Sequence, residues 1–385
     1  MKFFLKIACD LFITGSRGLR PLAGFGAAPQ GLFAALLFLL YISSPAEASR
    51  VVFLGDVMMH EQQLTAARTG DDWNFARSFR AVRPLLEDAL VVANLETVLA
   101  GGESGYSGRP PFNAPDALAP VLAESGVDIL TLSNNHILDR GPEGAMRTAR
   151  VAEEAGMLPL GLEGGLSRWA NPLVVEHGGF RWAFVSLLDP QIPGAQKMFS
   201  SDVRPAPLDE TSLLHSLRAA REASPDFVVA CVHWGEEYRT EPSDRQRDLA
   251  KRAIENGADI VIGTHPHVLQ PVEMTQTARG VGFVAYSLGN FISHQRTPPR
   301  ERSVALAVDV SRTDGAARIV RVSVATLVVR AIWRGRYSVE VEPAAMRDKK
   351  NMPGVGADVL DFLGVSHSPD ARGFHTVWGA EAGER

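Results

Sequence analysis

The chain has 385 residues, with 39 Lys or Arg against 44 Asp or Glu, so its formal net charge is −5 at pH 7. This mild acidity excludes non-specific binding to nucleic acid, which needs a strong positive field. With 45% hydrophobic and 22% charged residues, the composition is that of a globular protein, not of a disordered chain, a collagen or a polytopic membrane protein. Two cysteines, Cys9 and Cys231, are too few for a disulfide framework, so a large hydrophobic core must provide the stability.

The first 48 residues differ in composition from the rest of the chain. Basic residues come first, an apolar run covers residues 32–42, and small residues in an Ala-x-Ala arrangement end at Ala48. This order is typical of a secretory signal peptide. The apolar run is shorter than the ~20 residues of a spanning helix, so we expect cleavage after Ala48, with an uncleaved N-terminal anchor as the alternative. The remainder of the chain is then extracytoplasmic: periplasmic, secreted or membrane-anchored.

From Arg50 onward, short runs rich in Val, Ile and Phe alternate with stretches of helical spacing. The predicted strands are 51–55, 89–96, 127–133, 182–188, 226–235, 258–265 and 282–290. The predicted helices are 116–126, 142–156, 209–223 and 244–257, several of which end in glycine. This alternation predicts an α/β architecture with largely buried parallel strands. It leaves open whether the strands form one doubly wound sheet or a pair of packed sheets.

The last ninety residues have a different pattern. Residues 303–310, 318–329 and 332–341 are predicted as strands of an antiparallel meander, so segment 296–345 is expected to close the domain formed by residues 50–295. Residues 346–385 have no sustained period and many Gly, Pro and polar residues, which predicts a flexible C-terminal tail.

Polar side chains that suit a metal ion follow most of the predicted strands. In open α/β sheets, ligands bind beyond the carboxyl ends of the strands, so these side chains are expected at one rim. The first is Asp56, after Gly55, although a simple turn or helix cap explains a Gly-Asp pair equally well. Asn94 and Glu96 come next, two residues apart in an extended run, and so face the same side. A buried carboxylate there is costly without a cation partner.

A second polar group follows the strand at 127–133. Asn134, Asn135 and His136 stand together, and Asp139 comes three residues later. Asparagine oxygen, imidazole and carboxylate on one loop suit a divalent cation together with a general acid. A cluster of Asx turns capping the next helix is the alternative, but it explains the asparagines and not the histidine.

The most informative single segment is Gly263 to His267, with the sequence GTHPH. Pro266 favours an extended backbone at His265, so we expect His265 and His267 to project to one side, where two imidazoles can reach one ion or two adjacent ions. His233 ends another strand and is a further candidate ligand. Cys231, on the same strand, is interpreted as a small core residue.

Six segments in this order resemble the CapA family of poly-γ-glutamate capsule biosynthesis proteins. They are GDVMMH (55–60), NLET (94–97), NNHILDRG (134–141), HWGEEY (233–238), GTHPHVLQ (263–270) and YSLGNF (286–291). The family is similar to the calcineurin-like metallophosphoesterases. That resemblance implies a four-layer α/β/β/α sandwich of two mixed sheets flanked by helices.

The resemblance also implies roles for individual residues. One or two divalent ions (Mn, Fe, Zn or Mg) would be bound by six side chains, with Glu96 in the bridging position: Asp56, Glu96, Asn135, His233, His265 and His267. His136 would be the general acid, and Asp139 is assigned to the catalytic group with it. Substrate contacts are expected from Glu236, Tyr238, Arg239 and Asn290.

The first segment departs from the superfamily pattern. An Asp-x-His pair is usual there, but Asp56 is followed by Val57 and Met58. A thioether is a poor ligand for hard divalent ions. One metal position therefore has one imidazole fewer, and a single ion is an alternative to two.

Three classes of function follow from these observations. The first is a CapA-like protein of capsule biosynthesis, a metal-dependent hydrolase or transferase acting on an anionic cell-surface polymer such as poly-γ-glutamate, with membrane synthase or export partners. Arg109, Arg140 or Arg239 would offset the charge of such a polymer. The alternatives are a general metallophosphoesterase and a non-catalytic assembly or export factor.

Overall fold

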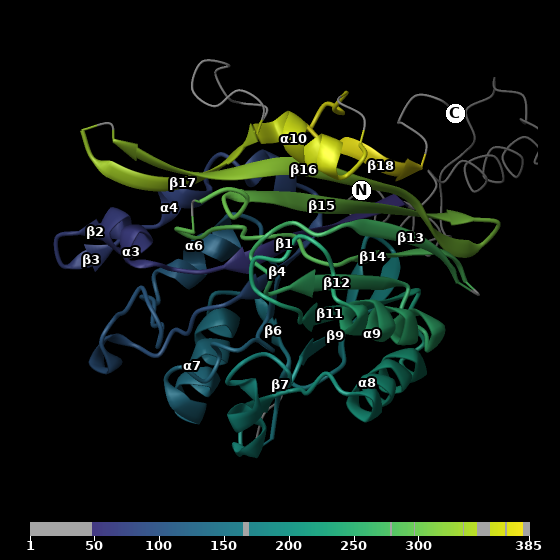
Figure 1. Ribbon diagram of the computed structural model, residues 1–385, viewed down its shortest axis with the longest axis horizontal. Coiled ribbons are helices and arrows are strands. Elements are labelled where there is room, and N and C mark those ends of the chain that lie inside the picture. Colours follow the sequence, from purple (N-terminus) through teal and green to yellow (C-terminus); the bar gives the residue numbers. More distant parts are fainter. Residues whose placement is uncertain are drawn as a thin grey trace, which may run out of the picture. The chain divides into compact units, whose positions relative to one another are not determined.

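Two mixed β-sheets form the centre of the protein (Figure 1). The computed structural model describes residues 48–164, 169–277, 279–295, 297–333, 335–344, 355–365 and 368–379. The predicted signal peptide lies outside these residues, except that Ala48, the expected cleavage position, is the first residue of β1 (Ala48–Val57).

The first sheet has eight strands, with the order β17-β16-β15-β1-β4-β5-β6 and with β18 paired to β16. The strands β1, β4 (Leu90–Leu95), β5 (Ile129–Thr131) and β6 (Leu158–Leu160) are parallel. The strands β15 (Arg302–Thr313), β16 (Ala316–Trp333), β17 (Tyr337–Pro343) and β18 (His375–Gly379) extend it antiparallel to β1 or to one another. The antiparallel meander predicted near the C-terminus is therefore present, and it completes the sheet begun by β1.

The second sheet has six strands, in the order β13-β14-β12-β11-β9-β8. Its parallel centre comprises β9 (Phe180–Leu188), β11 (Phe227–His233), β12 (Ile260–Thr264) and β14 (Gly280–Ala285). The strands β8 (Leu173–His177) and β13 (Val272–Thr277) flank it antiparallel to their neighbours. Two short ladders, β2 (Arg68–Thr69) with β3 (Asp72–Trp73) and β7 (Leu162–Glu163) with β10 (Arg204–Pro205), lie outside both sheets.

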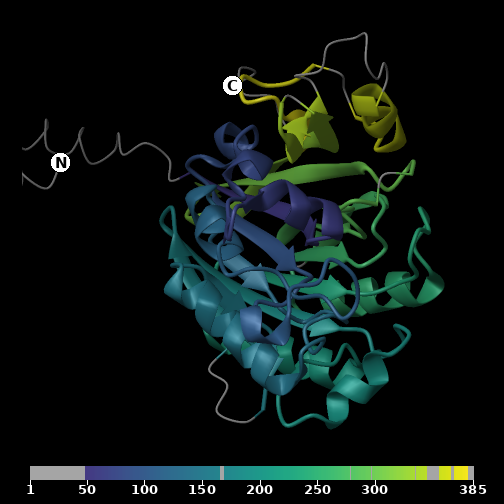
Figure 2. The same ribbon diagram turned by 90° about the vertical axis from the view of Figure 1, so that its left-hand side faces the viewer.

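Helices cover the outer face of each sheet, and they lie on opposite sides of the sheet pair (Figures 1 and 2). On the first sheet pack α3 (Glu61–Ala67), α4 (Ala76–Phe79), α5 (Arg83–Leu86), α6 (Leu118–Glu124) and α7 (Gly141–Glu154). On the second sheet pack α8 (Glu210–Glu222) and α9 (Asp244–Glu255). Two 3-10 turns, Gly102–Ser104 and Ala195–Ser200, lie in connecting segments.

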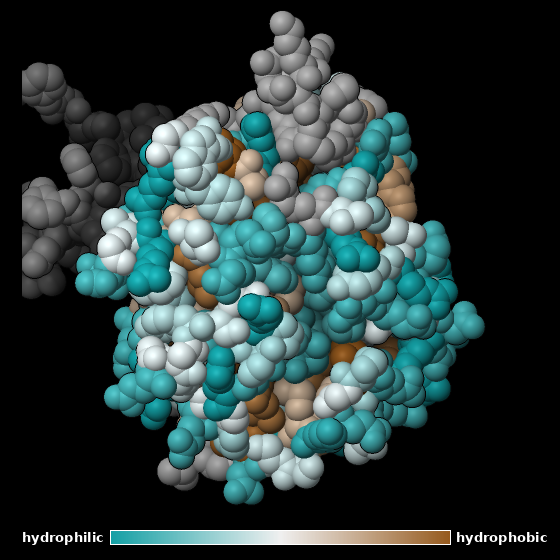
Figure 3. Space-filling model, turned by 60° about the vertical axis from the view of Figure 1, so that its left-hand side comes forward, coloured by the Kyte–Doolittle hydropathy of each residue, from teal (hydrophilic) through white to brown (hydrophobic). Residues whose placement is uncertain are grey.

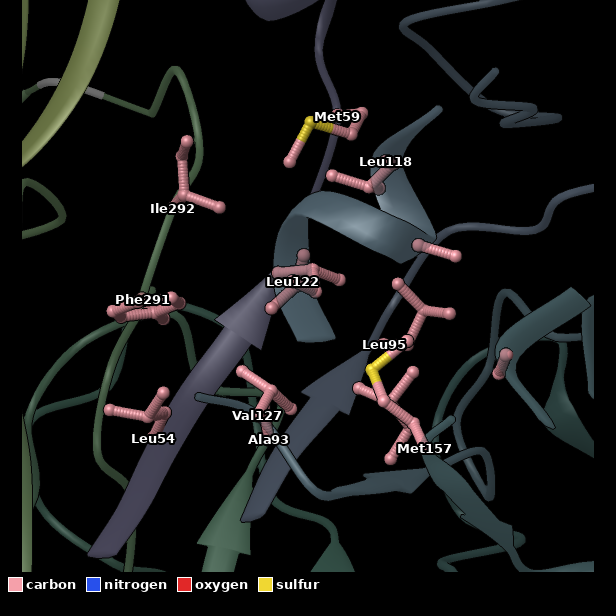
Figure 4. Close-up of a cluster of buried hydrophobic side chains, with 14 of the residues drawn as sticks. Leu54, Met59, Ala93, Leu95, Leu118, Leu122, Val127, Met157, Phe291 and Ile292 are labelled. Atoms are coloured by element: carbon pink, nitrogen blue, oxygen red, sulfur yellow. The ribbon is translucent and has the colours of Figure 1, made fainter. Parts of the chain in front are cut away.

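The strand sequences produce these layers because alternate side chains enter different cores. In β1, Val51 and Phe53 lie in the core between the sheets, whereas Val52 and Leu54 lie in the core shared with the helices. Figure 4 shows the latter core, where side chains of β1, β4 and α6 meet Phe291 and Ile292 from a distant loop. Three cores separate four layers, so the expected α/β/β/α sandwich is confirmed.

Local signals also agree with the helices that were predicted. The Ser243 side chain accepts a hydrogen bond from the backbone of Gln246, whose side chain accepts one from the Ser243 backbone, so α9 begins with a capping box. Gly257, just beyond α9, has φ +107°, a conformation that favours glycine after a helix. The helices α3, α4 and α5, which have seven, four and four residues, were not predicted.

Two expectations need correction. The run 282–290 is a strand only to Ala285, and its remainder is loop backbone. Within the expected flexible tail, α10 (Val355–Phe362) buries Val359 and Leu360 in the core between the sheets, and β18 pairs with β16. These two elements are short and show no sequence period that would predict them. Their positions depend on contacts with the long strand β16.

The surface is mainly hydrophilic on the side shown in Figure 3, with apolar residues in small separate areas. Among the residues that the structure describes, none of the helices has the length and apolar character needed to cross a bilayer.

Candidate metal centre

Parallel strands from both sheets end at one cluster of polar residues. Asp56 is near the end of β1, opposite Asn94 on β4, and Glu96 follows β4 directly. From the second sheet, β11 ends with His233, and His265 follows the last residue of β12. All of these side chains except that of Asn94 are at most 1% exposed, which is unusual for charged groups.

Two overlapping groups of potential metal ligands occur in this cluster. One comprises Asp56, Glu96 and His267, and the other comprises Glu96, His233 and His265; within each group the ligand atoms lie within 4.8 Å of one another. Glu96 belongs to both, with Oε1 at 3.6 Å from His233 Nε2 and 3.9 Å from His267 Nε2. Glu96 is therefore the one residue that the two groups share.

The electrostatics of the cluster favour a bound cation. Neither carboxylate oxygen of Glu96 has a hydrogen-bond partner among the described residues, and the same holds for Nδ1 of His265. Burial, reinforced by Asp56, raises the pKa of Glu96 well above its usual value. Burial and neighbouring imidazoles lower the pKa of His233 and His265. Carboxylates and neutral imidazoles are the donors that a divalent ion requires, so the side chains present fit such an ion.

The backbone of the GTHPH segment differs from the prediction. His265 has φ +97° and His267 has φ +58°, so the expected extended conformation of His265 is wrong. The His265 amide donates to Asp56 Oδ2 at 3.3 Å, and the Pro266 carbonyl accepts from the Tyr238 amide at 2.7 Å, which holds the turn in this conformation. The two imidazoles nevertheless lie on the same side, with ring centroids 5.7 Å apart. Strained backbone of this kind costs about 1–3 kcal/mol and is concentrated at functional sites.

Two glycines allow the chains to approach closely beneath the cluster. A Cβ atom on Gly55 would lie 1.8 Å from the carbonyl oxygen of Gly289, and one on Gly263 would lie 1.9 Å from that of Tyr286. The Asp56 amide donates to the same Gly289 oxygen at 3.1 Å. The loop after β14 is thereby attached to the end of β1.

Hydrogen bonds orient the histidines of the cluster. His233 Nδ1 lies 2.9 Å from Thr264 Oγ1, so its Nε2 faces Asn135 Oδ1 at 2.8 Å and Glu96. Asn135, which the family resemblance assigns as a ligand, thus lies beside the second group of potential ligands. His267 Nδ1 lies 3.1 Å from Asn290 Oδ1, and Asn290 Nδ2 donates back to the His267 carbonyl at 3.3 Å. Such outer partners fix the tautomer and the ring orientation of metal-binding histidines.

His136 and Asp139 form a pair beside the cluster. His136 Nδ1 lies 3.0 Å from Asp139 Oδ2, which also accepts a 2.6 Å hydrogen bond from the Phe112 amide. The Phe112 ring stands edge-on to the rings of His136 and His60. Burial and nearby His267 lower the pKa of His60 to about 4. The predicted catalytic pair is therefore brought together, with its imidazole packed against an aromatic ring.

The four residues predicted to contact the substrate lie in different surroundings. Glu236 and Arg239 are exposed and form an ion pair at 3.0 Å with each other, without a described contact to the ligand cluster. The ring of Tyr238 lies 6.1 Å from that of His267. Asn290 is buried and hydrogen-bonded to His267, so its position is that of an orienting residue, not of an exposed substrate contact.

Several residues near the site were missed or not assigned a role by sequence reasoning. Thr264 and Asn134 lie inside the recognised segments, next to the candidate ligands. Their position in the sequence was therefore a signal that they could orient those ligands. Arg300 lies beyond the last segment and has no motif around it. Cys231 is buried in the core between the sheets, and burial raises its pKa to about 12, which agrees with its interpretation as a core residue.

Residues 50–295 match the model of a family described as the bacterial capsule synthesis protein PGA_cap. The chain belongs to this family. It is 31% identical over 261 residues to the capsule biosynthesis protein CapA of Bacillus anthracis, a match that covers 65% of this chain and 61% of that one. It is 29% identical over 250 residues to the PGA biosynthesis protein CapA of Bacillus subtilis, covering 63% of each.

The matched part of the chain therefore spans somewhat less than two thirds of each PGA_cap relative. Among solved structures, the calcineurin-like phosphoesterase YfkN of Bacillus subtilis aligns with 82% of this chain and 96% of its own, with 13% identity and a TM-score of 0.46.

Proposed function

We propose that the protein is a metal-dependent hydrolase or transferase that acts on an anionic cell-surface polymer such as poly-γ-glutamate. The observation that carries this proposal is the shared position of Glu96, whose buried carboxylate belongs to two groups of ligand atoms at once. The polymer is proposed from membership of the capsule synthesis family and from the names of the two Bacillus relatives.

The described side chains divide into two ligand sets that share Glu96. Asp56 and His267 would complete one set, and His233 and His265 the other, where Asn135 Oδ1 lies beside His233. Divalent ions bound there would supply Lewis acidity, which activates water and polarises a carbonyl or phosphoryl oxygen. Met58, buried and two residues after Asp56, offers only a thioether, so we expect the set with Asp56 and His267 to be the weaker one.

His136 is the group best placed to transfer a proton. Its Nδ1 lies 3.0 Å from Oδ2 of Asp139, whose carboxylate is fixed in turn by the Phe112 amide. Its Nε2 has no hydrogen bond among the described residues and is free to hold a proton for a leaving group. An imidazole oriented by a carboxylate is a general acid or base that typically contributes about 10²- to 10⁴-fold to a rate.

This same pair favours catalysis over a purely structural metal site. A structural site needs ligands only, and an imidazole-carboxylate pair beside the ligands, partly exposed to solvent, would have no function in it. The non-catalytic assembly factor and the general phosphoesterase remain the two alternatives that an experiment must separate. Membrane synthase or export partners are proposed from the capsule context alone.

The test is the metal content of the purified protein, with hydrolysis of poly-γ-glutamate and of an aryl phosphate measured in parallel. We expect one to two equivalents of divalent metal and metal-dependent cleavage of the polymer. His265→Ala should lose metal, whereas His136→Asn should keep the metal and lose about 10²-fold or more in turnover. Turnover of the aryl phosphate alone would favour a general phosphoesterase, and absence of metal under every loading condition would contradict the proposal.

We also propose that the protein acts outside the cytoplasm, on the basis of the signal-like first 48 residues. In intact cells whose outer barrier has been opened, an added protease should digest the protein while a cytoplasmic marker stays intact. Full protection of the protein would contradict this location.

A further inference from the structure

An arginine outside every recognised segment stacks on the tyrosine beside the ligand cluster. The guanidinium carbon of Arg300 lies 3.5 Å from the ring centroid of Tyr238. The same ring lies 6.1 Å from the imidazole of His267, so Tyr238 neighbours both the guanidinium and a candidate ligand residue. The backbone carbonyl of Arg300 faces the Asn290 amide at 3.5 Å, which attaches its loop to the same histidine.

The Tyr238 ring is fixed firmly enough to act as a platform. Tyr238 has φ +68°, and its amide donates to the Pro266 carbonyl at 2.7 Å, within the turn that carries His265 and His267. Gln295 donates to the Tyr238 hydroxyl at 3.4 Å from the loop that also carries Arg300. Guanidinium groups stack well on aromatic faces while their N–H edges stay free for an anion.

The other basic residues near the site are already engaged or lack such a platform. Arg239 is paired with Glu236, and Arg140 donates to the carbonyls of Gly105 and Pro111. Arg109 is exposed and makes no ring contact among the described residues. Arg300, in contrast, has no carboxylate within ion-pair distance in the described part of the chain, although it is partly buried. A positive charge that is positioned but unpaired beside a ligand cluster is suited to an external anion.

We infer that Arg300, stacked on Tyr238, recognises a carboxylate of the substrate and so makes the site selective for a polyanionic chain over its neutral counterpart. This inference rests on the proposed function for the substrate class, and it adds a specificity residue to it. Glu237 opposes this attraction, because its carboxylate faces the Tyr238 hydroxyl. The chain as a whole, with a net charge of −5, repels a polyanion, so a positive charge at the site, such as that of Arg300, favours its binding.

The test measures binding of two short oligomers to the full, metal-loaded chain. One probe is a γ-linked glutamate hexamer, and the other is the same hexamer with its side carboxylates converted to amides. Arg300→Gln should weaken binding of the carboxylate hexamer about 10- to 100-fold and leave binding of the amide hexamer unchanged. Arg300→Lys should lose less, and Glu237→Gln should bind the carboxylate hexamer more tightly.

Arg218→Gln, an exposed residue of α8, is the matched control for the loss of one positive charge and should bind both hexamers as the wild type does. Metal content and thermal unfolding, measured on each variant, establish that the fold and the cluster are intact. Where turnover is measurable, Arg300→Gln should raise KM far more than it lowers kcat.

Equal binding of the carboxylate hexamer by Arg300→Gln and the wild type would overturn the inference, and so would a wild type that binds neither hexamer or does not distinguish them. Failure of the proposed function gives a different result. In that case the wild type still prefers the carboxylate hexamer through Arg300 but does not cleave it with any metal.

Discussion

The side-chain amide of Asn94 donates a 2.7 Å hydrogen bond to Oδ1 of Asp56 across the β1–β4 pair. Asn94 Oδ1 in turn accepts from Asn134 Nδ2 at 3.1 Å, and Asn134 Oδ1 accepts from the His136 amide at 3.1 Å. A chain of buried amides thus connects the carboxylate of Asp56, a proposed metal ligand, to the loop that carries the proposed general acid.

Replacement of Asn94 by alanine should therefore weaken metal binding without removing a ligand. Asp56 would lose the donor that fixes its orientation, and loss of such an outer partner typically costs about 10- to 100-fold in metal affinity. Competition with a fluorescent chelator would measure this change. Asn113→Ala, which removes another buried asparagine, is the control for general destabilisation. An unchanged affinity in Asn94→Ala would contradict the orienting role.

Glu96→Gln should lose metal and yet make the metal-free protein more stable at neutral pH. The folded state raises the pKa of Glu96, so its contribution to stability is present below the unfolded pKa of about 4.3 and is lost as pH rises through the folded pKa. A glutamine side chain does not ionise, so this loss should be absent in the variant. Urea unfolding of both proteins in chelator, at pH 4 and pH 8, measures the difference.

Glu103→Gln, at an exposed position, is the matched control and should show neither effect. If the free energy of unfolding depends on pH equally in the wild type and in Glu96→Gln, the ionisation of Glu96 does not cause the loss of stability at high pH.

Met58→His should strengthen metal binding at the group with Asp56 and His267. It introduces an imidazole two residues after Asp56, in the Asp-x-His arrangement that this chain lacks. We expect the number of bound Mn²⁺ ions per chain to rise towards two, which elemental analysis after dialysis would measure. Met59→His is the control: Met59 packs in the core shared with the helices (Figure 4), so that variant should lose stability and gain no metal.

Asp309→Asn should destabilise the protein at neutral pH, far from the ligand cluster. Burial alone would raise the pKa of Asp309, but hydrogen bonds from Arg50 and Arg321, both 2.7 Å, outweigh it and lower the pKa. Removal of the charge leaves two partly buried guanidinium groups with only the Asp370 carboxylate, 3.8 Å from each, as an ionic partner, which we expect to cost about 2–4 kcal/mol.

The sign of the pH dependence follows from the lowered pKa. The stability that Asp309 contributes is present above its unfolded pKa of about 3.9 and is lost as pH falls through the lower folded value. The free energies of unfolding of the wild type and Asp309→Asn should therefore converge in acid, and denaturant titrations at pH 7 and pH 3 would measure this. Asp71→Asn, at an exposed position, should match the wild type at both pH values.

The sequence alone was sufficient for the central strands, for the helices α6, α7, α8 and α9, and for the candidate ligands of the cluster. Short continuous apolar runs mark the buried parallel strands, and the polar residue that ends each run is carried to the same edge of its sheet. This is why Asp56, Glu96, His233 and His265 were found before their distances were known. The short helices α3, α4, α5 and α10 and the strand β18 could not be found, because neighbouring elements determine them.

Only the tertiary structure showed that the two groups of candidate ligands have one residue in common and which neighbours orient them. No sequence spacing indicates that Glu96 belongs to two ligand groups, since the two sheets must first pack against each other. The positive φ of His265 is likewise set by Asp56, which is 209 residues distant in the chain. Arg300 reaches Tyr238 by the same kind of long-range packing. Local residue preferences determine which side chains end each strand, whereas distances and partners depend on contacts between remote segments.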